Sequence, residues 1–561
     1  MPTCKNCNHP FTITDADKTF YARINVPAPT LCPDCREQRR LVFRNERNYY
    51  RRQCDLCQKN IISVYDPAVT SNVYCNACWW GDGWDAKNYA REFDWSRPFF
   101  EQYRELLAAV PKIAMMNDNG SQSVNCEYTY DFAFGKNAYM VVAAWRVEDS
   151  MYGLQTNWVK DSVDNINVNH SELMYESVAC EESYGCQQCQ QCQGCRDCIF
   201  GYDLRGCHDC ILSSGLRNQA YCIWNKPYSK EAYEQEKAKL GLDSWASREA
   251  CKQRFAEFIL KTPRKYANLL KCQDSTGDNL VRCKNSQYCF VQTGLQDCKF
   301  MIHGDGAKDC YDCRDTGGPE LCYDSITPDN SYQALFVVFC WKSQYVAYSD
   351  NCHGVKNIFG CVGMKKAHHC ILNKQYDEFA YEALKGKIIE HMQKTGEWGQ
   401  FFSPAVTLFA YNETAAQEWS PLTKEQAVAL GYRWQEALPE LSGKETLTSN
   451  DIPDSINQVT ENICNEVLAC VDCGKNYKVI KQEYEIYKKL SVPIPRRCVL
   501  CRYQQRSALM NPKKLWHRQC MCQEQHDWHQ GGGCKNEFET TYSPDRPERV
   551  YCEECYQKEI Y

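Results

Sequence analysis

The chain has 561 residues, a formal net charge of -6 and 40 cysteines. The length exceeds that of one ordinary domain and predicts two to four folded units. The charge excludes a uniformly basic nucleic-acid coat, so any basic surface must be local. The start, MPTCKNCNHPF, has no secretory leader, and no run approaches the roughly 18 apolar residues of a membrane helix. We therefore expect a soluble cytoplasmic protein with no membrane partner, in which C-x-x-C pairs stay reduced and bind metal.

The first predicted element is a zinc finger built from two C-x2-C pairs separated by 24 residues. Its ligands are Cys4, Cys7, Cys32 and Cys35. The spacer FTITDADKTFYARI alternates apolar and polar residues, which predicts a hairpin, and a Pro-containing loop leads to the second pair, which opens a helix. This order describes a treble-clef-like finger, and four cysteines give tetrahedral Zn²⁺ a closed, structural site.

A second four-cysteine set follows the first finger. Its ligands are Cys54, Cys57, Cys75 and Cys78, and the two sets define a predicted N-terminal double zinc module, residues 1–80. The alternative is that these are reduced cysteines buried as small apolar residues. That alternative does not explain pairs whose spacers recur near the other end of the chain.

A basic stretch joins the two predicted sites. On one helix, five arginines would be spaced by 4, 4, 3 and 4 residues and would form a single stripe; they are Arg36, Arg40, Arg44, Arg47 and Arg51. A basic helix braced by zinc suits phosphate contacts, which predicts nucleic-acid binding. The alternative is a structural stripe, either paired with acids such as Glu37 and Glu46 or packed against the body of the protein.

The middle of the chain contains a second duplication. YCIWNKPYSKEAYEQEKAKL, from Tyr221, resembles HCILNKQYDEFAYEALKGKI, from His369. Cys198, Cys210 and Cys222 recur at every twelfth position, and short β-type pieces at regular spacing predict stacked coils of a β-solenoid with cysteine facing inward. The predicted parts are a first Cys-rich β-solenoid unit with its entry helix, a helical connector and a second such unit, at residues 95–228, 229–268 and 269–376.

The densest cysteine run has a thiol at every third residue from Cys186 to Cys198. A bound metal is one interpretation. However, this period matches neither the paired C-x2-C of a treble clef nor the pattern of an iron-sulfur site. The other interpretation is irregular solenoid turns with stacked or exposed thiols.

The C-terminal part repeats the N-terminal module. After a helix and an irregular aromatic-rich linker, residues 377–462, a C-terminal double zinc module is predicted over residues 463–561. An insertion, MCQEQHDWHQGGG, makes one ligand of its last site uncertain, since Cys522, His526 or His529 could substitute. The predicted ligands of its two sites are Cys470, Cys473, Cys498 and Cys501, and then Cys520, Cys534, Cys552 and Cys555.

No familiar catalytic motif appears in the sequence. The phosphate-cradling G-x-x-x-x-G-K-[ST], H-E-x-x-H and G-x-S-x-G patterns are all missing. Because stacked β-coils also occur in enzymes that act on polysaccharides, a row of carboxylates is a third possibility. It would comprise Asp197, Asp209, Asp297 and Asp309, although Asp is also common at turns.

Several motifs resemble known families. The first finger, with C-x2-C, an F-T-I strand, -TFY-, a Pro loop and C-x2-C-R, is similar to a family of zinc-binding domains described from sequence. Through FRNERNYYRRQCDLC, FGCVGMKKAHHCILNKQY and TTYSPDRPERVYCEECYQKEIY, the whole chain resembles an uncharacterised Cys-rich zinc-finger family of candidate-phyla bacteria with reduced genomes. The resemblance implies zinc and a bacterial cytoplasm, and it implies no activity.

Together these features predict a multidomain, β-rich fold, in which treble-clef-like zinc modules at both termini flank two Cys-rich β-solenoid units with capping helices. We expect about four Zn²⁺ ions per chain. The predicted function is a non-enzymatic binding scaffold that docks to RNA or a ribonucleoprotein through the arginine stripe. The alternatives are a protein–protein scaffold with purely structural zinc and, third, a carbohydrate-active β-solenoid enzyme.

Overall fold

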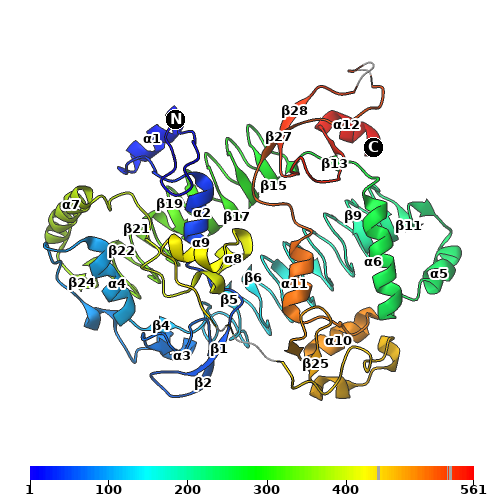
Figure 1. The fold of residues 1–561 in the computed structure, drawn as a ribbon, viewed down its shortest axis with the longest axis horizontal. Helices are drawn as coiled ribbons and strands as arrows, with labels where there is room; N and C mark the ends of the chain where they lie inside the picture. Colours follow the sequence, from blue (N-terminus) through cyan, green and yellow to red (C-terminus); the bar gives the residue numbers. More distant parts are fainter. Residues whose placement is uncertain (437, 439–441, 527, 530–532, 561) are drawn as a thin grey trace. The chain divides into compact units, whose positions relative to one another are not determined.

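The computed structural model describes residues 1–436, 438, 442–526, 528–529 and 533–560. The chain divides into two compact units, and each unit combines segments that are far apart in the sequence (Figure 1). Unit 1 comprises Met1–Met115 and Asn268–Pro439, and unit 2 comprises Met116–Ala267 and Glu440–Tyr561. The N-terminal zinc module therefore folds with the second Cys-rich repeat, and the C-terminal module folds with the first.

The first finger contains two helices, α1 (Asp15–Arg23) and α2 (Pro33–Leu41). The predicted hairpin is wrong, because α1 occupies the spacer. Thr14 Oγ1 accepts a hydrogen bond from the Asp17 amide at 3.2 Å, while the Asp17 carboxylate accepts one from the Thr14 amide at 2.9 Å. This reciprocal capping box satisfies two amides at the start of the helix. The local cap thus outweighs the alternation of apolar residues.

The second finger is built on an antiparallel hairpin in which Tyr50 pairs with Ser63. Cys75 is the N-cap of the short helix that follows. A parallel pair of short strands then joins the finger to the segment after the entry helix. The elements are β1 (Tyr50–Gln53), β2 (Asn60–Ser63), β3 (Val73–Tyr74), α3 (Asn76–Trp80), η1 (Ala86–Tyr89), α4 (Phe99–Ala109) and β4 (Lys112–Ile113).

The second Cys-rich repeat forms an eleven-stranded sheet, here called the second ladder. Its strands are parallel up to the last one. After the first pair of strands, which is offset by eleven residues, each paired residue lies opposite the one twelve positions later, as in Phe290, Ile302 and Arg314. A final antiparallel strand ends the ladder at the repeated N-K-x-Y motif. The strands are β14 (Leu269–Leu270), β15 (Gly277–Val281), β16 (Cys289–Thr293), β17 (Ile302–Asp305), β18 (Tyr311–Gly317), β19 (Tyr323–Ile326), β20 (Tyr332–Leu335), β21 (Gln344–Ala347), β22 (Lys356–Phe359), β23 (His368–Ile371) and β24 (Lys374–Gln375).

The first Cys-rich repeat, in unit 2, forms the first ladder with the same twelve-residue offset. Single parallel bridges connect its two four-stranded parts, as from Met151 to Val163 and on to Tyr175. It too ends in an antiparallel strand. The strands are β5 (Tyr130–Ala133), β6 (Val142–Trp145), β7 (Asn157–Lys160), β8 (Asn169–Glu172), β9 (Ile199–Tyr202), β10 (His208–Ser214), β11 (Ala220–Ile223) and β12 (Lys226–Pro227).

A three-residue pattern underlies both ladders. In Gln187–Gln188–Cys189, the first residue bridges to the next rung, the second has φ of 52° and the third is fully buried. The left-handed second residue turns the chain after each short extended piece. Because three divides twelve, the buried third residues of successive rungs lie in line, and small side chains suit these rows.

The remaining elements of unit 1 follow the second ladder. They are α7 (Glu378–Thr395), η2 (Tyr411–Glu413), α8 (Ala415–Trp419) and α9 (Lys424–Ala429). Helix α7 begins at its N-cap Asp377 and ends at Gly396, whose φ of 74° is the left-handed conformation typical of a helix C-terminus.

In unit 2, two helices follow the first ladder, and the C-terminal module repeats the element order of the N-terminal one. A helix again occupies the finger spacer, so the hairpin predicted there is also wrong. The elements are α5 (Lys230–Lys239), α6 (Trp245–Ile259), β13 (Arg264–Lys265), η3 (Ile456–Gln458), η4 (Glu461–Asn465), β25 (Leu468–Ala469), β26 (Asn476–Tyr477), α10 (Lys481–Leu490), α11 (Val499–Ser507), β27 (Trp516–Gln519), β28 (Glu537–Thr540), β29 (Val550–Tyr551) and α12 (Glu553–Ile560).

Candidate metal centres and buried arginines

The sixteen predicted zinc ligands converge in four groups of four, and within each group all sulfur atoms lie within 4.8 Å of one another. One Sγ–Sγ distance in each group is 3.7 Å (Cys7–Cys32), 3.8 Å (Cys57–Cys75), 3.8 Å (Cys473–Cys498) or 3.9 Å (Cys534–Cys552). Zn–S bonds of about 2.3 Å at tetrahedral angles place sulfurs about 3.8 Å apart. The groups therefore fit closed, structural Zn²⁺ sites.

Backbone amides near the sulfurs favour the thiolate form. Burial opposes ionisation of Cys54 and Cys470, but hydrogen bonds from nearby backbone amides outweigh it and lower the pKa of each thiol to about 7. In the first finger, the hydrogen bond with Cys35 lowers the pKa of Cys32 to about 5. The thiolate is the form that binds metal, so these three cysteines are the more readily ionised ligands, whereas the same hydrogen bond raises the pKa of Cys35.

The second pair of ligands in each first-type finger lies at the start of a helix. Cys32 and Cys498 are the N-caps of α2 and α11, and neither side chain makes a capping hydrogen bond. Coordination of Zn²⁺ by these two cysteines would fix the start of each helix, and with it the direction of the helix face one turn later.

The last site has a second candidate group beside it. Cys522, His526, His529 and Cys555 also place one ligand atom each within 4.8 Å of the others, so Cys555 belongs to both groups. Residues 527 and 530–532 of the insertion lie outside the described residues. Since Cys520, Cys534, Cys552 and Cys555 converge on their own, the insertion is not needed to complete the predicted site.

Residues 2–43 match a family model described as "Probable treble clef domain". This range contains all four ligands of the first finger, so this part of the chain is a treble-clef zinc domain, as predicted. No curated protein sequence matches the chain.

Among solved structures, the chain is similar to one titled "putative acetyltransferase from Desulfovibrio desulfuricans G20". The identity is 11%, and the match covers 43% of this chain and 62% of that chain, with a TM-score of 0.10. A score this low carries no argument about fold or function. Within the described residues, no helix is both long enough and apolar enough to cross a bilayer.

The predicted basic stripe does not lie on one helix. Helix α2 ends at Leu41, so it carries only Arg36 and Arg40 of the five arginines. Arg44 and Arg47 lie beyond the helix, and Arg51 lies in β1.

The first three arginines are buried, with exposed fractions of 2%, 1% and 0%. Arg36 Nε is 2.9 Å from Asp312, and a terminal nitrogen of Arg40 is 2.6 Å from Asp324. Both aspartates belong to the second ladder, on the strands β18 and β19 that α2 contacts. These guanidinium groups therefore neutralise carboxylates inside unit 1 and do not face solvent.

Arg44 completes this cluster from the loop after α2. It lies 2.8 Å from Asp315, which also accepts from His303. Burial disfavours the charged carboxylate, but Arg44 and Arg314 outweigh burial and hold the pKa of Asp315 well below its usual value. Asp315 thus remains ionised in a region that excludes water.

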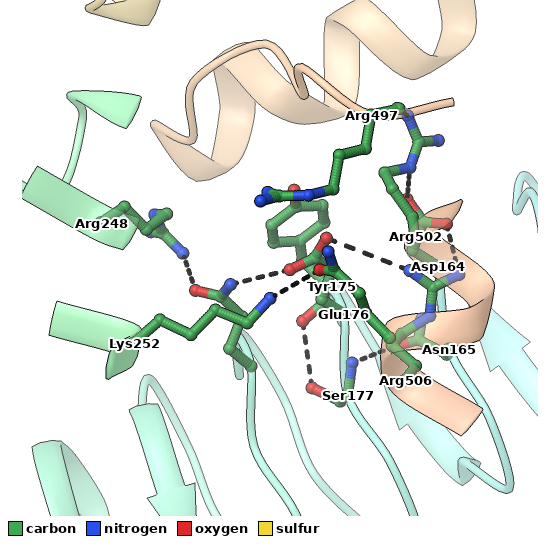
Figure 2. A network of polar contacts seen from close by, with 12 residues as sticks. Asp164, Asn165, Tyr175, Glu176, Ser177, Arg248, Lys252, Arg497, Arg502 and Arg506 are labelled. Atoms are coloured by element: carbon green, nitrogen blue, oxygen red, sulfur yellow. Dashed lines mark hydrogen bonds and ion pairs between the residues drawn. The ribbon is translucent and has the colours of Figure 1, made fainter. Parts of the chain in front are cut away.

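The C-terminal module repeats this arrangement in unit 2 (Figure 2). Arg502 Nε and a terminal nitrogen of Arg506 lie 2.9 Å and 2.6 Å from the two carboxylate oxygens of Asp164, in the first ladder. Arg502 also pairs with Glu483 on α10 at 3.0 Å. Arg36 and Arg502 stand directly after the last cysteine of their fingers, and Arg40 and Arg506 follow four residues later. The duplicated segments thus share one structural task.

The other two arginines of the stripe differ from the first three. Arg47 is half-buried and lies 3.4 Å from Glu418 on α8, whereas Arg51 is exposed. The contacts described for Arg47 and Arg51 neither support nor contradict nucleic-acid binding, so that function remains a prediction.

The dense cysteine run occupies the buried rows of the first ladder. Cys186, Cys189, Cys192, Cys195 and Cys198 are at most 2% exposed and pack with Val159, Val168 and Met174. The Cys198 thiol donates towards the backbone oxygens of Arg196 and Cys207, at 3.4 Å and 3.7 Å. Within the described residues, the groups of converging metal ligands contain no thiol of this run. The three-residue spacing is thus the regular spacing of the buried rows.

The four aspartates that would form the catalytic row of a carbohydrate-active enzyme each contact a polar or charged side chain. Asp297 accepts from Asn285, Asp309 pairs with Arg23, and Asp209 contacts His208. Asp197 lies 3.5 Å from Arg196, while burial and the neighbouring Asp209 raise its pKa. Turn positions with local polar partners account for these carboxylates.

Sequence reasoning missed the aspartates that receive the arginines. Asp164, Asp312, Asp315 and Asp324 all have φ between 44° and 62°, in the second position of a three-residue piece. The available signal was an acid directly before a buried residue, as in YDC and RDT (residues 311–313 and 314–316), but turn-forming aspartates give the same signal.

Proposed function

We propose that this protein is a zinc-stabilised binding scaffold that docks a partner protein, and that its two ladders are β-solenoids held by the zinc modules. The observation that carries the proposal is the burial of Arg36, Arg40, Arg502 and Arg506 in ion pairs with ladder aspartates. In this proposal, zinc orients helices α2 and α11, these helices place their arginines against the ladder aspartates, and the resulting ion pairs hold each zinc module on its ladder. The duplicated basic segments then serve internal assembly.

The solenoid part of the proposal is supported by the twelve-residue offset that recurs along most of both ladders and by the three-residue pattern. A parallel bridge from each residue to the one twelve positions later requires the chain to return to the same place once per rung. Such a repeat creates long rows of identical spacing, and exposed rows of this kind suit docking.

One exposed row of unit 2, here called the aromatic row, is a candidate docking surface. It comprises Phe134, Arg146, Trp158 and His170, which recur at every twelfth position and are all exposed. The Arg146 guanidinium lies 5.6 Å from the Phe134 ring and 4.2 Å from the Trp158 ring, and His170 stacks on Trp158 at 5.9 Å. Tryptophan and arginine dominate the binding energy of protein interfaces.

The row is also compatible with a second candidate function, RNA binding, because bases stack on exposed aromatic rings and on arginine. Protein docking is favoured, since the net charge of the chain is -6 and three of the five stripe arginines are neutralised inside unit 1. RNA would then use the aromatic row together with Arg47 and Arg51.

The test combines crosslinking in the cells that express the protein with a double variant, R146S/W158S. The matched control is Y288S, which removes an exposed aromatic residue of the second ladder, 43% exposed. We expect crosslinked proteins that persist after ribonuclease treatment, are kept by Y288S and are lost with R146S/W158S. Crosslinks that disappear with ribonuclease would replace protein docking with RNA binding, and crosslinks unchanged in R146S/W158S would exclude the aromatic row.

A further inference from the structure

The insertion in the last zinc finger brings three additional metal-binding side chains to a site that already has four. Cys522 follows Cys520 by two residues and is fully buried, and the backbones of His526 and His529 exchange two hydrogen bonds of 3.3 Å and 3.1 Å. The knuckle itself is kept, because the Cys520 amide donates to Asn536 as the Cys54 amide donates to Lys59, both at 2.8 Å. The insertion thus adds ligands without dismantling the finger.

The distances within the added group match a metal site. Cys522 Sγ lies 3.3 Å from His526 Nε2, and Cys555 Sγ lies 3.4 Å from His529 Nε2. With Zn–S about 2.3 Å and Zn–N about 2.0–2.1 Å, tetrahedral geometry places sulfur and nitrogen about 3.6 Å apart. Two thiolates and two imidazoles are among the ligand sets that zinc prefers.

From this geometry we propose that the C-terminal module binds a second Zn²⁺ through Cys522, His526, His529 and Cys555, and that the Cys555 thiolate bridges this ion to the one held by Cys520, Cys534, Cys552 and Cys555. A thiolate sulfur has several lone pairs and can donate to two metal ions at once. The full chain then binds five zinc ions.

Electrostatics favours the pair of ions over a single ion held by four thiolates. Four thiolates around one Zn²⁺ have a formal charge of -2, whereas five thiolates around two Zn²⁺ with neutral imidazoles have -1. All four cysteines of the first group are buried, so the excess negative charge is costly there. The second cation reduces that cost.

Native mass spectrometry of the full chain tests the proposal. We expect five zinc ions in the wild type, four in H526A/H529A and four in C522S. The control H517A removes a histidine of the same module that is outside the cluster, on β27, and keeps five. Retention of four ions by the variants also shows that the other fingers remain folded. Four ions in the wild type, unchanged in H526A/H529A, would overturn the proposal.

Cobalt substitution provides a second measurement that separates the two sites spectroscopically. The difference spectrum between Co²⁺-loaded wild type and H526A/H529A is expected to have the d–d bands of one tetrahedral ion with two sulfur and two nitrogen ligands. A difference that shows only a changed four-sulfur site would mean that the histidines act as exchanged ligands of a single ion. This test does not depend on the docking proposal, since neither result changes if the aromatic row is altered.

Discussion

At the scale of single residues, charge burial explains the duplicated segments. A guanidinium group removed from water needs polar partners that replace its hydration, and for Arg40 these are the carboxylates of Asp324, Glu37 and Asp312. Arg51 is exposed, so water solvates its guanidinium group and no carboxylate is needed beside it. Residues of the same type in one sequence stretch therefore differ widely in what they contribute to stability.

We expect R40M to reduce the free energy of unfolding of unit 1 by about 3–5 kcal/mol, because the substitution leaves buried carboxylates without a partner. R51Q, at an exposed position, is the control and should change the free energy by less than about 0.5 kcal/mol. Denaturant unfolding of the zinc-loaded protein measures the free energy of unfolding of both variants, with amide hydrogen exchange of α2 as the probe of unit 1. Equal stability of the two variants would mean that the buried cluster is not a net structural tie.

The burial of His353 predicts that the stability of the protein depends on pH. Its ring lies among Trp79, Trp80 and Trp341, and within the described residues neither ring nitrogen has a hydrogen-bond partner. Burial, with a contribution from the charge of Lys365, lowers the pKa of His353 to about 3. Because the unfolded chain binds a proton near pH 6.5 and the folded one does not, stability is complete above pH 6.5 and decreases towards pH 3.

Between pH 7.5 and 5.5, the wild type should lose about 1.4 kcal/mol through this group. H353F, which keeps an aromatic ring but does not titrate, should lose that much less over the same range. Protonation of zinc thiolates acts on both proteins and cancels in the difference between their unfolding free energies. Identical pH profiles would show that the pKa of His353 is the same in the folded and the unfolded protein.

At the scale of elements, each ladder depends on small side chains in its buried rows. Serine and cysteine both occur there, and the Ser177 hydroxyl accepts from the Cys189 amide at 3.3 Å across one rung. Both side chains are small and can donate to a backbone oxygen of their own rung. Cysteine therefore suits these buried positions because of its small size and its hydrogen bond to the backbone, and not because of the reactivity of its thiol.

Accordingly, C189S should change the free energy of unfolding by less than about 1.5 kcal/mol and leave the zinc content unchanged, since a hydroxyl of similar size can make the same contacts. C189L should cost about 1–3 kcal/mol or more, because the row has no room for a larger side chain. Denaturation curves and metal analysis of both variants provide the comparison. Loss of a metal ion in C189S would restore the metal interpretation of the cysteine run.

At the scale of the whole molecule, each compact unit is assembled from segments that lie far apart in the chain. In unit 1, Arg36 and Asp312 are 276 residues apart, and in unit 2, Arg506 and Asp164 are 342 residues apart. Zinc binding near a terminus therefore controls the environment of aspartates in the middle of the chain. Loss of zinc should therefore destabilise parts of the ladders as well as the fingers.

We expect a strong zinc chelator to increase amide hydrogen exchange in residues 311–327 of unit 1 and 163–177 of unit 2, because these segments contain the aspartates that the fingers neutralise. Protection should decrease there more than in residues 277–281, the β15 strand near the start of the second ladder. Mass-spectrometric exchange with and without chelator, followed by zinc add-back, measures the effect. Loss of protection confined to the fingers would mean that modules and ladders are independently stable.

The sequence by itself determined the zinc ligands and the repeat. Thiolate pairs at fixed spacing impose local geometry, so Cys4, Cys7, Cys32 and Cys35 could be identified without a structure, and cysteines at every twelfth position revealed the rung length. It did not determine the conformation of the spacers, where the cap at Thr14 outweighed an alternating pattern. Only the tertiary structure decided that Arg36, Arg40 and Arg44 face inward, because their aspartate partners come from a repeat far along the chain and resemble ordinary turn residues. It also brought Cys522, His526 and His529 beside Cys555, because a shared ligand depends on the distances between folded segments and not on their spacing in the sequence.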